Sequence, residues 1–308
     1  MIIAPHSRFS GEVKLVLMDL NGRVLQDTGW SPNLITNTGL TNMGFIGWAQ
    51  NCNIGSSAAA PAFTDTALAS WLAEAQSYPE SSVVPTAPNW ELITTQKARF
   101  NAGVGTGTIR EIGFNLVSAY PDNTGMNIRA LASPEVTKSA DQVLDVYHRM
   151  TRWPDLVDRT GVVSIEGVDY NYIVRASQLD SGSPLPTQND FVTAYAAIAI
   201  QNSLYDVQTY TDNISTVDSE PSAPISNGWC TNGLSLGGAS GYQDYTILFN
   251  LDNANGNIRS FRVLEYGHGL ADRGWQVRLG KVSDDSPLVK DNTKELEIDF
   301  RVTWARYP

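Results

Sequence analysis

The chain has 308 residues and a formal net charge of -11, with 21 Lys and Arg against 32 Asp and Glu. This charge opposes binding to nucleic acid, because Lys and Arg supply most of the affinity for phosphates. Hydrophobic residues form 42% of the chain, and no apolar run approaches the roughly 20 residues of a membrane-spanning helix, so we expect a soluble protein with neither nucleic-acid nor membrane partners.

The first element in chain order is a hairpin. Residues 13–18 alternate between apolar side chains on one face and a mixed set on the other, which is typical of a strand. Asn21-Gly22 then favours a tight turn, and the return strand is expected over 23–26.

Two helices are predicted next. The segment 37–48 carries apolar residues at i, i+3, i+4 spacing, with Asn37 or Thr38 as its cap. A shorter helix is expected over 65–75, capped by Thr64 and with one apolar face.

Irregular segments and strands make up the rest of the first half. Ser, Pro, Ala and Gly are frequent in 53–64 and 76–89, and loops this long are usually functional or ordered by a partner. Strands are predicted over 92–100, 108–116 and 143–151. The connector that follows is short and charged, so the two halves are expected to sit rigidly together.

The second half repeats the first at an offset of 150 residues. The set Gly11, Val13, Asp19, Asn21 and Val24 recurs as Gly161, Val163, Asp169, Asn171 and Val174. The register holds within a residue or two for the rest of the chain. A solenoid repeat would have a period of about 20–50 residues, so the pattern predicts duplication of a whole domain.

The expected elements of the second half follow those of the first. A hairpin is predicted over 163–174, with Tyr170-Asn171-Tyr172 in place of the Asn-Gly turn, and Asn189 is expected to cap a helix carrying Phe191 to Ile198. An irregular segment at 215–241 precedes strands over 245–251, 257–264 and 296–304. The predicted fold is mainly β, antiparallel and β-sandwich-like, with one or two helices per copy and two tandem domains, 1–154 and 155–308.

One motif matches a catalytic pattern. Gly233-Leu234-Ser235-Leu236-Gly237 has the G-x-S-x-G spacing of a nucleophile elbow, with His268 further along the chain. That chemistry needs the serine at a strand-to-helix turn. Here a glycine-rich stretch follows, which favours a loop over an esterase, and we expect no enzyme activity.

Two further loops invite ligand interpretations. The run 103–107 resembles a phosphate-binding loop, and 252–256 resembles a calcium loop, but Ala254 stands where an oxygen ligand is required. A hairpin loop accounts for both segments, and a weak cation site at the second is the alternative. Cys52 and Cys230 are too few for a disulfide framework or a zinc site, so both are expected to be free thiols. No cofactor and no metal are expected.

The last strand of each half carries an acid-to-arginine strip. Asp145 and Arg149 in the first half answer to Glu297 and Arg301 in the second. Pairing within or between strands explains the strip, and a contact between subunits is the alternative. His148 lies on the opposite face and is expected to be partly buried and hydrogen-bonded within the sheet.

Eight tryptophans are present. Most are expected in the core or as loop anchors. Trp90 and Trp229 lie in the long irregular segments, where they are predicted as anchors that stack on sugars or fill pockets of a neighbouring subunit.

A series of short motifs carries a family resemblance. The first half contains Gly29-Trp30-Ser31-Pro32-Asn33-Leu34-Ile35, Thr64-Asp65-Thr66-Ala67-Leu68, Thr108-Ile109-Arg110-Glu111-Ile112 and Asn127-Ile128-Arg129-Ala130-Leu131. In this order they resemble tail, fibre and neck structural proteins of tailed bacteriophages, over roughly residues 11–153. The second half lacks the Thr-Asp-Thr-Ala-Leu segment.

The resemblance implies a virion protein that is assembled in the host cytoplasm. It would form part of a ring or a fibre attachment in the tail, baseplate or collar, with itself, as a trimer or hexamer, and other virion proteins as partners. Closed rings repeat one heterologous contact, which suits a duplicated chain. The alternatives are a fibre or adhesin domain that binds a host-surface glycan and, as a third class, a serine esterase on Ser235 or a glycan hydrolase.

Overall fold

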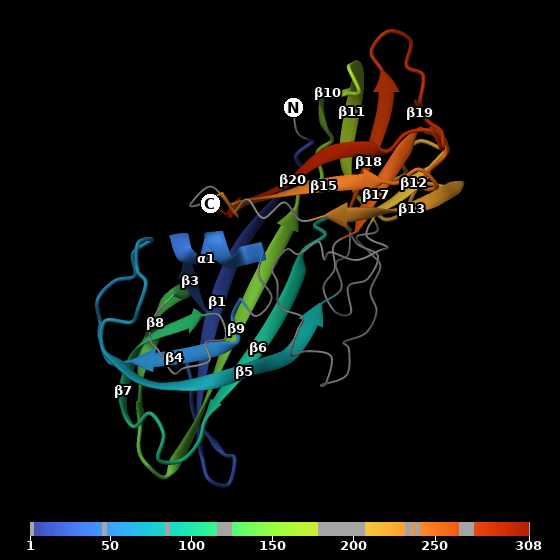
Figure 1. Ribbon diagram of the computed structural model, residues 1–308. Helices are drawn as coiled ribbons and strands as arrows, with labels where there is room; N and C mark the ends of the chain where they lie inside the picture. Colours follow the sequence, from blue (N-terminus) through green and yellow to red (C-terminus); the bar gives the residue numbers. More distant parts are fainter. Residues whose placement is uncertain are drawn as a thin grey trace.

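The computed structural model describes residues 3–44, 48–83, 87–115, 125–177, 207–231, 236–237, 241–264 and 274–307. Strands dominate this part of the chain, and the helical elements within it are α1 (Asn37–Thr41) and the 3-10 turn η1 (Asn42–Gly44). The prediction of a mainly β, antiparallel fold is confirmed. Figure 1 shows the first half of the chain, from blue to green, at one end of the molecule and the second half, from yellow to red, at the other.

The first half forms a closed eight-stranded barrel. Its strands are β1 (His6–Asp19), β3 (Ser31–Ile35), β4 (Asn51–Gly55), β5 (Trp71–Val83), β6 (Leu92–Phe100), β7 (Gly107–Asn115), β8 (Met126–Lys138) and β9 (Gln142–Pro154). Neighbours pair antiparallel in the order β1-β3-β8-β7-β4-β5-β6-β9, and β9 returns to β1. A short strand, β2 (Val24–Asp27), extends β1 as a hairpin.

The second half arranges eight strands in a comparable series. They are β10 (Arg159–Ile165), β11 (Val168–Ser177), β12 (Val207–Tyr210), β13 (Pro224–Thr231), β15 (Tyr242–Phe249), β17 (Ser260–Leu264), β18 (Gly274–Lys281) and β20 (Leu296–Arg306). They pair antiparallel in the order β10-β11-β18-β17-β12-β13-β15-β20. β14 (Leu236–Gly237) adds to β15, and β16 (Gly256–Ile258) pairs with β19 (Leu288–Lys290).

The two halves are joined through the start of the chain. β20 pairs in parallel with β1 from His6–Thr303 to Phe9–Arg306, and Ile3 bridges to Phe300. The indole of Trp304 also donates to the carbonyl oxygen of Leu40 at 2.7 Å. A single cluster of buried apolar side chains extends through both halves. The N-terminal segment thus adds a strand to the sheet of the second half, beside β20.

The turns differ from the prediction in the second half. The first hairpin turns over 20–23, where Gly22 has φ +81°, as expected. In the second hairpin the turn is Glu166-Gly167, with φ values of 50° and 77°, which is the geometry of a two-residue type I′ turn. The predicted turn at 170–172 is therefore wrong: Asn171 lies in β11 opposite Val162, because its aromatic and β-branched neighbours favour a strand.

Within the described residues, the helices are fewer and shorter than predicted. Of the expected helix over 37–48, residues 37–44 form α1 and η1, and residues 45–47 lie outside the described residues. The cap is Thr36, not Asn37 or Thr38, and its hydroxyl accepts from the amide of Gly39 at 2.9 Å. The helix predicted over 65–75 is wrong, since residues 56–70 form a loop and β5 begins at Trp71. Much of the supposedly irregular 76–89 belongs to β5, and 215–241 contains β13. The helix predicted from Asn189 to Ile198 lies outside the described residues.

Candidate functional site

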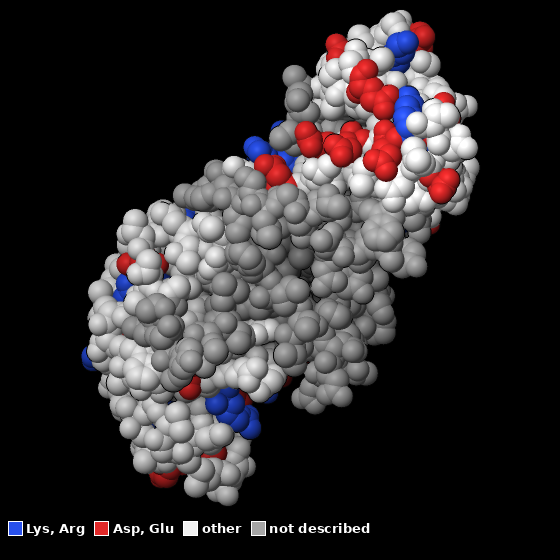
Figure 2. Space-filling view, in the orientation of Figure 1, with Lys and Arg blue, Asp and Glu red and all other residues white. Residues whose placement is uncertain are grey.

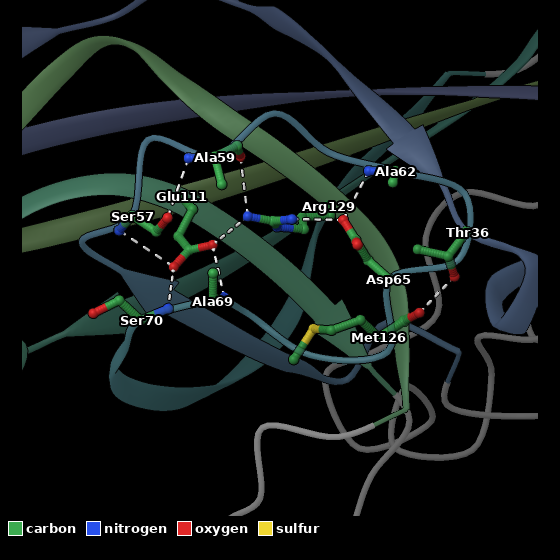
Figure 3. A network of polar contacts seen from close by, with 10 residues as sticks. All are labelled: Thr36, Ser57, Ala59, Ala62, Asp65, Ala69, Ser70, Glu111, Met126 and Arg129. Carbon is green, nitrogen blue, oxygen red and sulfur yellow. Dashed lines mark hydrogen bonds and ion pairs between the residues drawn. The ribbon is translucent and has the colours of Figure 1, made fainter.

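A network of buried polar side chains in the first half holds the loop 56–70. This loop joins β4 to β5 and carries the Thr64 to Leu68 motif. Glu111 on β7 and Arg129 on β8 lie beneath it, as Figure 3 shows. Both are buried, with exposed fractions of 0% and 3%, so each charge needs a partner.

Glu111 binds backbone amides at both ends of the loop. Its carboxylate accepts from the amide of Ser70 at 2.7 Å, from Ala69 at 3.1 Å and from Ser57 at 3.3 Å. It also accepts from the Arg129 guanidinium at 2.7 Å. The carboxylate thus fixes the two ends of the loop against the sheet.

Arg129 binds the middle of the same loop. Its guanidinium donates to Asp65 at 2.5 Å and to the carbonyl oxygen of Ala59 at 3.1 Å. Burial alone would lower the pKa of Arg129, but the hydrogen bonds to Asp65 and Glu111 raise it above its ordinary value. The Asp65 carboxylate accepts as well from the amide of Ala62 at 2.7 Å, and Figure 3 shows these contacts converging on one guanidinium.

The corresponding loop of the second half is held by a different pair. Residues 211–223 join β12 to β13. Buried Gln276 on β18 donates to the carbonyl oxygens of Ser215 and Thr216 at 3.1 and 2.9 Å, and accepts from the amide of Ser215 at 2.6 Å. Arg262 on β17 pairs with Glu220 of the loop. Each network anchors a loop over the sheet, and its charged groups are neutralised in place.

Three of the four strip residues form ion pairs within the chain. Asp145 is buried and accepts two hydrogen bonds from Arg99 of β6, at 2.6 and 2.7 Å. Arg149 pairs with Glu12 of β1 at 2.5 Å and lies over Trp30.

The arginine of the second-half strip also pairs with a carboxylate of a neighbouring strand and lies over an aromatic ring. Arg301 pairs with Asp244 of β15 at 2.5 Å and lies over Tyr242 at 3.9 Å. Glu297 is exposed on β20. Pairing between strands, the first interpretation, therefore accounts for three of these residues, and the contact between subunits stays a prediction.

The two tryptophans predicted as loop anchors occupy different settings. Trp90 has an exposed fraction of only 9% and packs with Ala176 and Val217 of the second half. Its ring is therefore buried in the contact between the two halves. Trp229 lies in strand β13 opposite Leu248, so it is not in a loop, and its side chain lies outside the described residues.

The two loops with ligand interpretations are not hairpins. Residues 101–106 join β6 to β7, and 250–255 join β15 to β16; in neither case do the two joined strands pair with each other. A buried lysine supports each loop. Lys138 donates to the carbonyl oxygen of Asn101 at 3.0 Å, and Lys290 donates to the side-chain oxygen of Asn255 at 2.9 Å. The second loop, interpreted above as a weak cation site, thus holds the ammonium of Lys290.

The remaining candidates divide between the core and the undescribed segments. His148 is fully buried against Trp48 and Phe114, and burial lowers its pKa to about 3. Its Nε2 atom has no hydrogen-bond partner within the described part of the chain, so the expectation of a satisfied, partly buried histidine is wrong. Cys52 is a buried free thiol. Ser235 and His268 lie outside the described residues.

The described residues offer neither a metal-binding cluster nor a membrane-spanning helix. They contain no group of three or more His, Cys, Asp and Glu arranged to hold a metal ion. No helix among them has the length and apolar character to cross a membrane. Comparison with known proteins finds no family model, no curated protein and no solved structure that matches this chain.

Proposed function

We propose that this chain is a structural virion protein of a tailed bacteriophage, built from two copies of one domain and forming part of a ring or fibre-attachment assembly in the tail, baseplate or collar. The observation that carries the proposal is the strand order. The series β1-β3-β8-β7-β4-β5-β6-β9 in the first half corresponds, strand for strand and in chain order, to β10-β11-β18-β17-β12-β13-β15-β20 in the second. Duplication is the simplest origin of such a match.

Local geometry supports the duplication. Gly105 and Ala254 have φ values of 62° and 58°, and Gly107 and Gly256 have 123° and 140°. Each of the two loops also contains a backbone hydrogen bond at the same position. The amide of Val104 donates to the carbonyl oxygen of Asn101 at 3.1 Å, and the amide of Asn253 donates to that of Asn250 at 3.0 Å. A non-glycine residue rarely adopts positive φ, so Ala254 is informative: it keeps the conformation of a glycine position in the other copy.

The remaining difference between the halves favours assembly. β9 closes on β1 over its whole length, whereas β20 pairs with the N-terminal segment and leaves β10 bound only to β11 among the described strands. A strand edge of this kind invites pairing with another chain. A closed ring repeats one heterologous contact between copies, and a molecule with two related but unequal ends is suited to it.

Native mass spectrometry of the purified protein tests the proposal. We expect a closed oligomer, a trimer or a hexamer, at micromolar concentration, and we expect antibodies against the chain to label phage particles. A stable monomer at high concentration together with absence from particles would contradict it.

The glycan-binding alternative has less support. A tryptophan that stacks on a sugar needs an accessible ring face, and the ring of Trp90 is buried against Ala176. A glycan array would separate the two functions, since the assembly proposal expects no binding that depends on Trp90.

A further inference from the structure

We propose that the repeating contact between copies joins the outward face of β9 in one chain to the outward face of β20 in the next. The inference rests on the proposed assembly and names its contact. We call the outward side chains of β1, β9 and β6 the first face, with Lys14, Tyr147 and Lys97 at its centre, and those of β15 and β20 the second face, with Glu297 and Asp299.

The first face presents two lysines on either side of a tyrosine. The register places Lys14 of β1, Tyr147 of β9 and Lys97 of β6 in one row across three strands. The two ammonium groups lie 4.9 and 5.7 Å from the centre of the Tyr147 ring. This row lies between the internal ion pairs Arg99–Asp145 and Arg149–Glu12.

The lysines of this row are only loosely paired. Lys14 lies 3.9 Å from Asp27 and Lys97 lies 3.3 Å from Glu80, and both carboxylates are on flanking strands and more than 40% exposed. Exposed pairs of this kind contribute little to stability. Both lysines can therefore exchange a solvated partner for a carboxylate of another chain.

The second face carries negative charge where the first face carries positive charge. The sequence repeat aligns Asp299 of β20 with Tyr147 of β9. The neighbour of Tyr147 on the adjacent strand is Lys97, whereas the neighbour of Asp299 is the uncharged Thr246 of β15. Glu297 and Asp299 are both exposed on β20. In the nearest row Arg301 is already neutralised by Asp244, so it does not offset these two carboxylates.

The acidic character extends beyond the two residues. Residues 155–308 carry 11 Lys and Arg against 20 Asp and Glu, whereas residues 1–154 carry 10 against 12. Figure 2 shows acidic side chains gathered over the part of the second half where β15 and β20 lie in Figure 1. Opposite potentials on two faces steer association and suppress wrong pairings. First-to-second contacts are attractive, and contacts between like faces repel, which enforces a head-to-tail arrangement.

Charge reversal in the full-length protein tests the contact. Glu297→Lys with Asp299→Lys reverses the second face, and Lys14→Glu with Lys97→Glu reverses the first. Each double variant is expected to raise the dissociation constant of assembly by about 100-fold or more at about 50 mM salt, because like charges then face each other. The quadruple variant, with both faces reversed, is expected to assemble again. Analytical ultracentrifugation measures all four proteins.

The controls separate this inference from the proposed function. Asp218→Lys with Asp284→Lys makes the same change of charge in loops of the second half and is expected to assemble as the parent does. Thermal melting by circular dichroism verifies that every variant folds. Double variants that assemble normally, or a quadruple variant that fails while it folds, would overturn the contact and leave the ring proposal in place. A monomeric parent protein would overturn both.

Discussion

At the scale of single residues, the structure uses buried charge and buried imidazole where an apolar core is the norm. His148 occupies the position that the repeat aligns with Phe300, and both are buried. Sequence alternation places His148 correctly on the inner face of β9. The absence of a hydrogen-bond partner at its Nε2 atom was not predictable, because the ring packs against Trp48 and Phe114, which belong to distant parts of the chain.

Replacing His148 with Phe is expected to make the protein less sensitive to acid. The folded-state pKa of about 3 lies below the ordinary 6.5, so between about pH 6.5 and pH 3 the unfolded chain binds up to one more proton than the folded chain. As the pH is lowered through this range, the free energy of unfolding falls by up to about 1.4 kcal/mol per pH unit. Urea unfolding at pH 7.5, 6 and 5 measures the slope, and an unchanged slope in His148→Phe would contradict the assignment.

The two buried lysines make a matched pair for a second test. Burial lowers the pKa of both Lys138 and Lys290, and each ammonium satisfies oxygens of its loop. Lys138→Met and Lys290→Met are each expected to cost about 1–3 kcal/mol, because buried carbonyl oxygens lose a charged donor. Lys294→Met, at an exposed pair with Glu166, is the control and should cost less than about 1 kcal/mol. Equal costs at all three sites would refute the loop-support role.

At the scale of elements, strands with clear alternation were predictable and loops were not. The predicted strand 92–100 coincides with β6, and 143–151 falls within β9. The helix expected over 65–75 does not form. Its apolar spacing extends over only a few residues, and hydrogen bonds to distant parts of the chain hold the segment as a loop instead. Asp65 accepts a hydrogen bond from Arg129, and the amides of Ala69 and Ser70 donate to Glu111. No local sequence pattern reveals partners that are more than 40 residues away.

Glu111→Gln is expected to release the loop 56–70. The variant keeps the shape of the side chain but leaves the buried guanidinium of Arg129 without one of its two carboxylates, which should cost about 3–5 kcal/mol. Hydrogen exchange at the amides of Ala69 and Ser70 should accelerate at the same time. Glu135→Gln removes a carboxylate from the exposed pair with Arg110 and is expected to cost less than about 1 kcal/mol. A similar cost for both variants would show that Glu111 does not hold the loop.

At the scale of the whole molecule, the parallel pairing of β1 with β20 ties the halves together. The offset of the repeat predicts two similar units, but it carries no information on which strand closes each one. Ile3 is fully buried, and the backbone of Arg301 donates to its carbonyl oxygen at 2.8 Å. The additional pairing of β1 with β20 forms only when the two halves come together in the folded chain, which explains why the sequence does not reveal it.

Removal of residues 1–5 from the full chain is expected to open this seam. The loss of buried Ile3 and of the bonds to β20 should cost about 2–4 kcal/mol. Hydrogen exchange should rise at the amides of Arg301 and Thr303, which donate to Ile3 and Pro5, and should be unchanged at Val146 in β9. Continued protection of both β20 amides would show that residues 1–5 do not hold this edge of β20.

Image averages of the purified, assembled protein by electron microscopy test the central claim most directly. We expect closed rings in which every chain contributes two similar densities and the same contact recurs around the ring. Single particles the size of one chain, or open aggregates without a repeating contact, would contradict it.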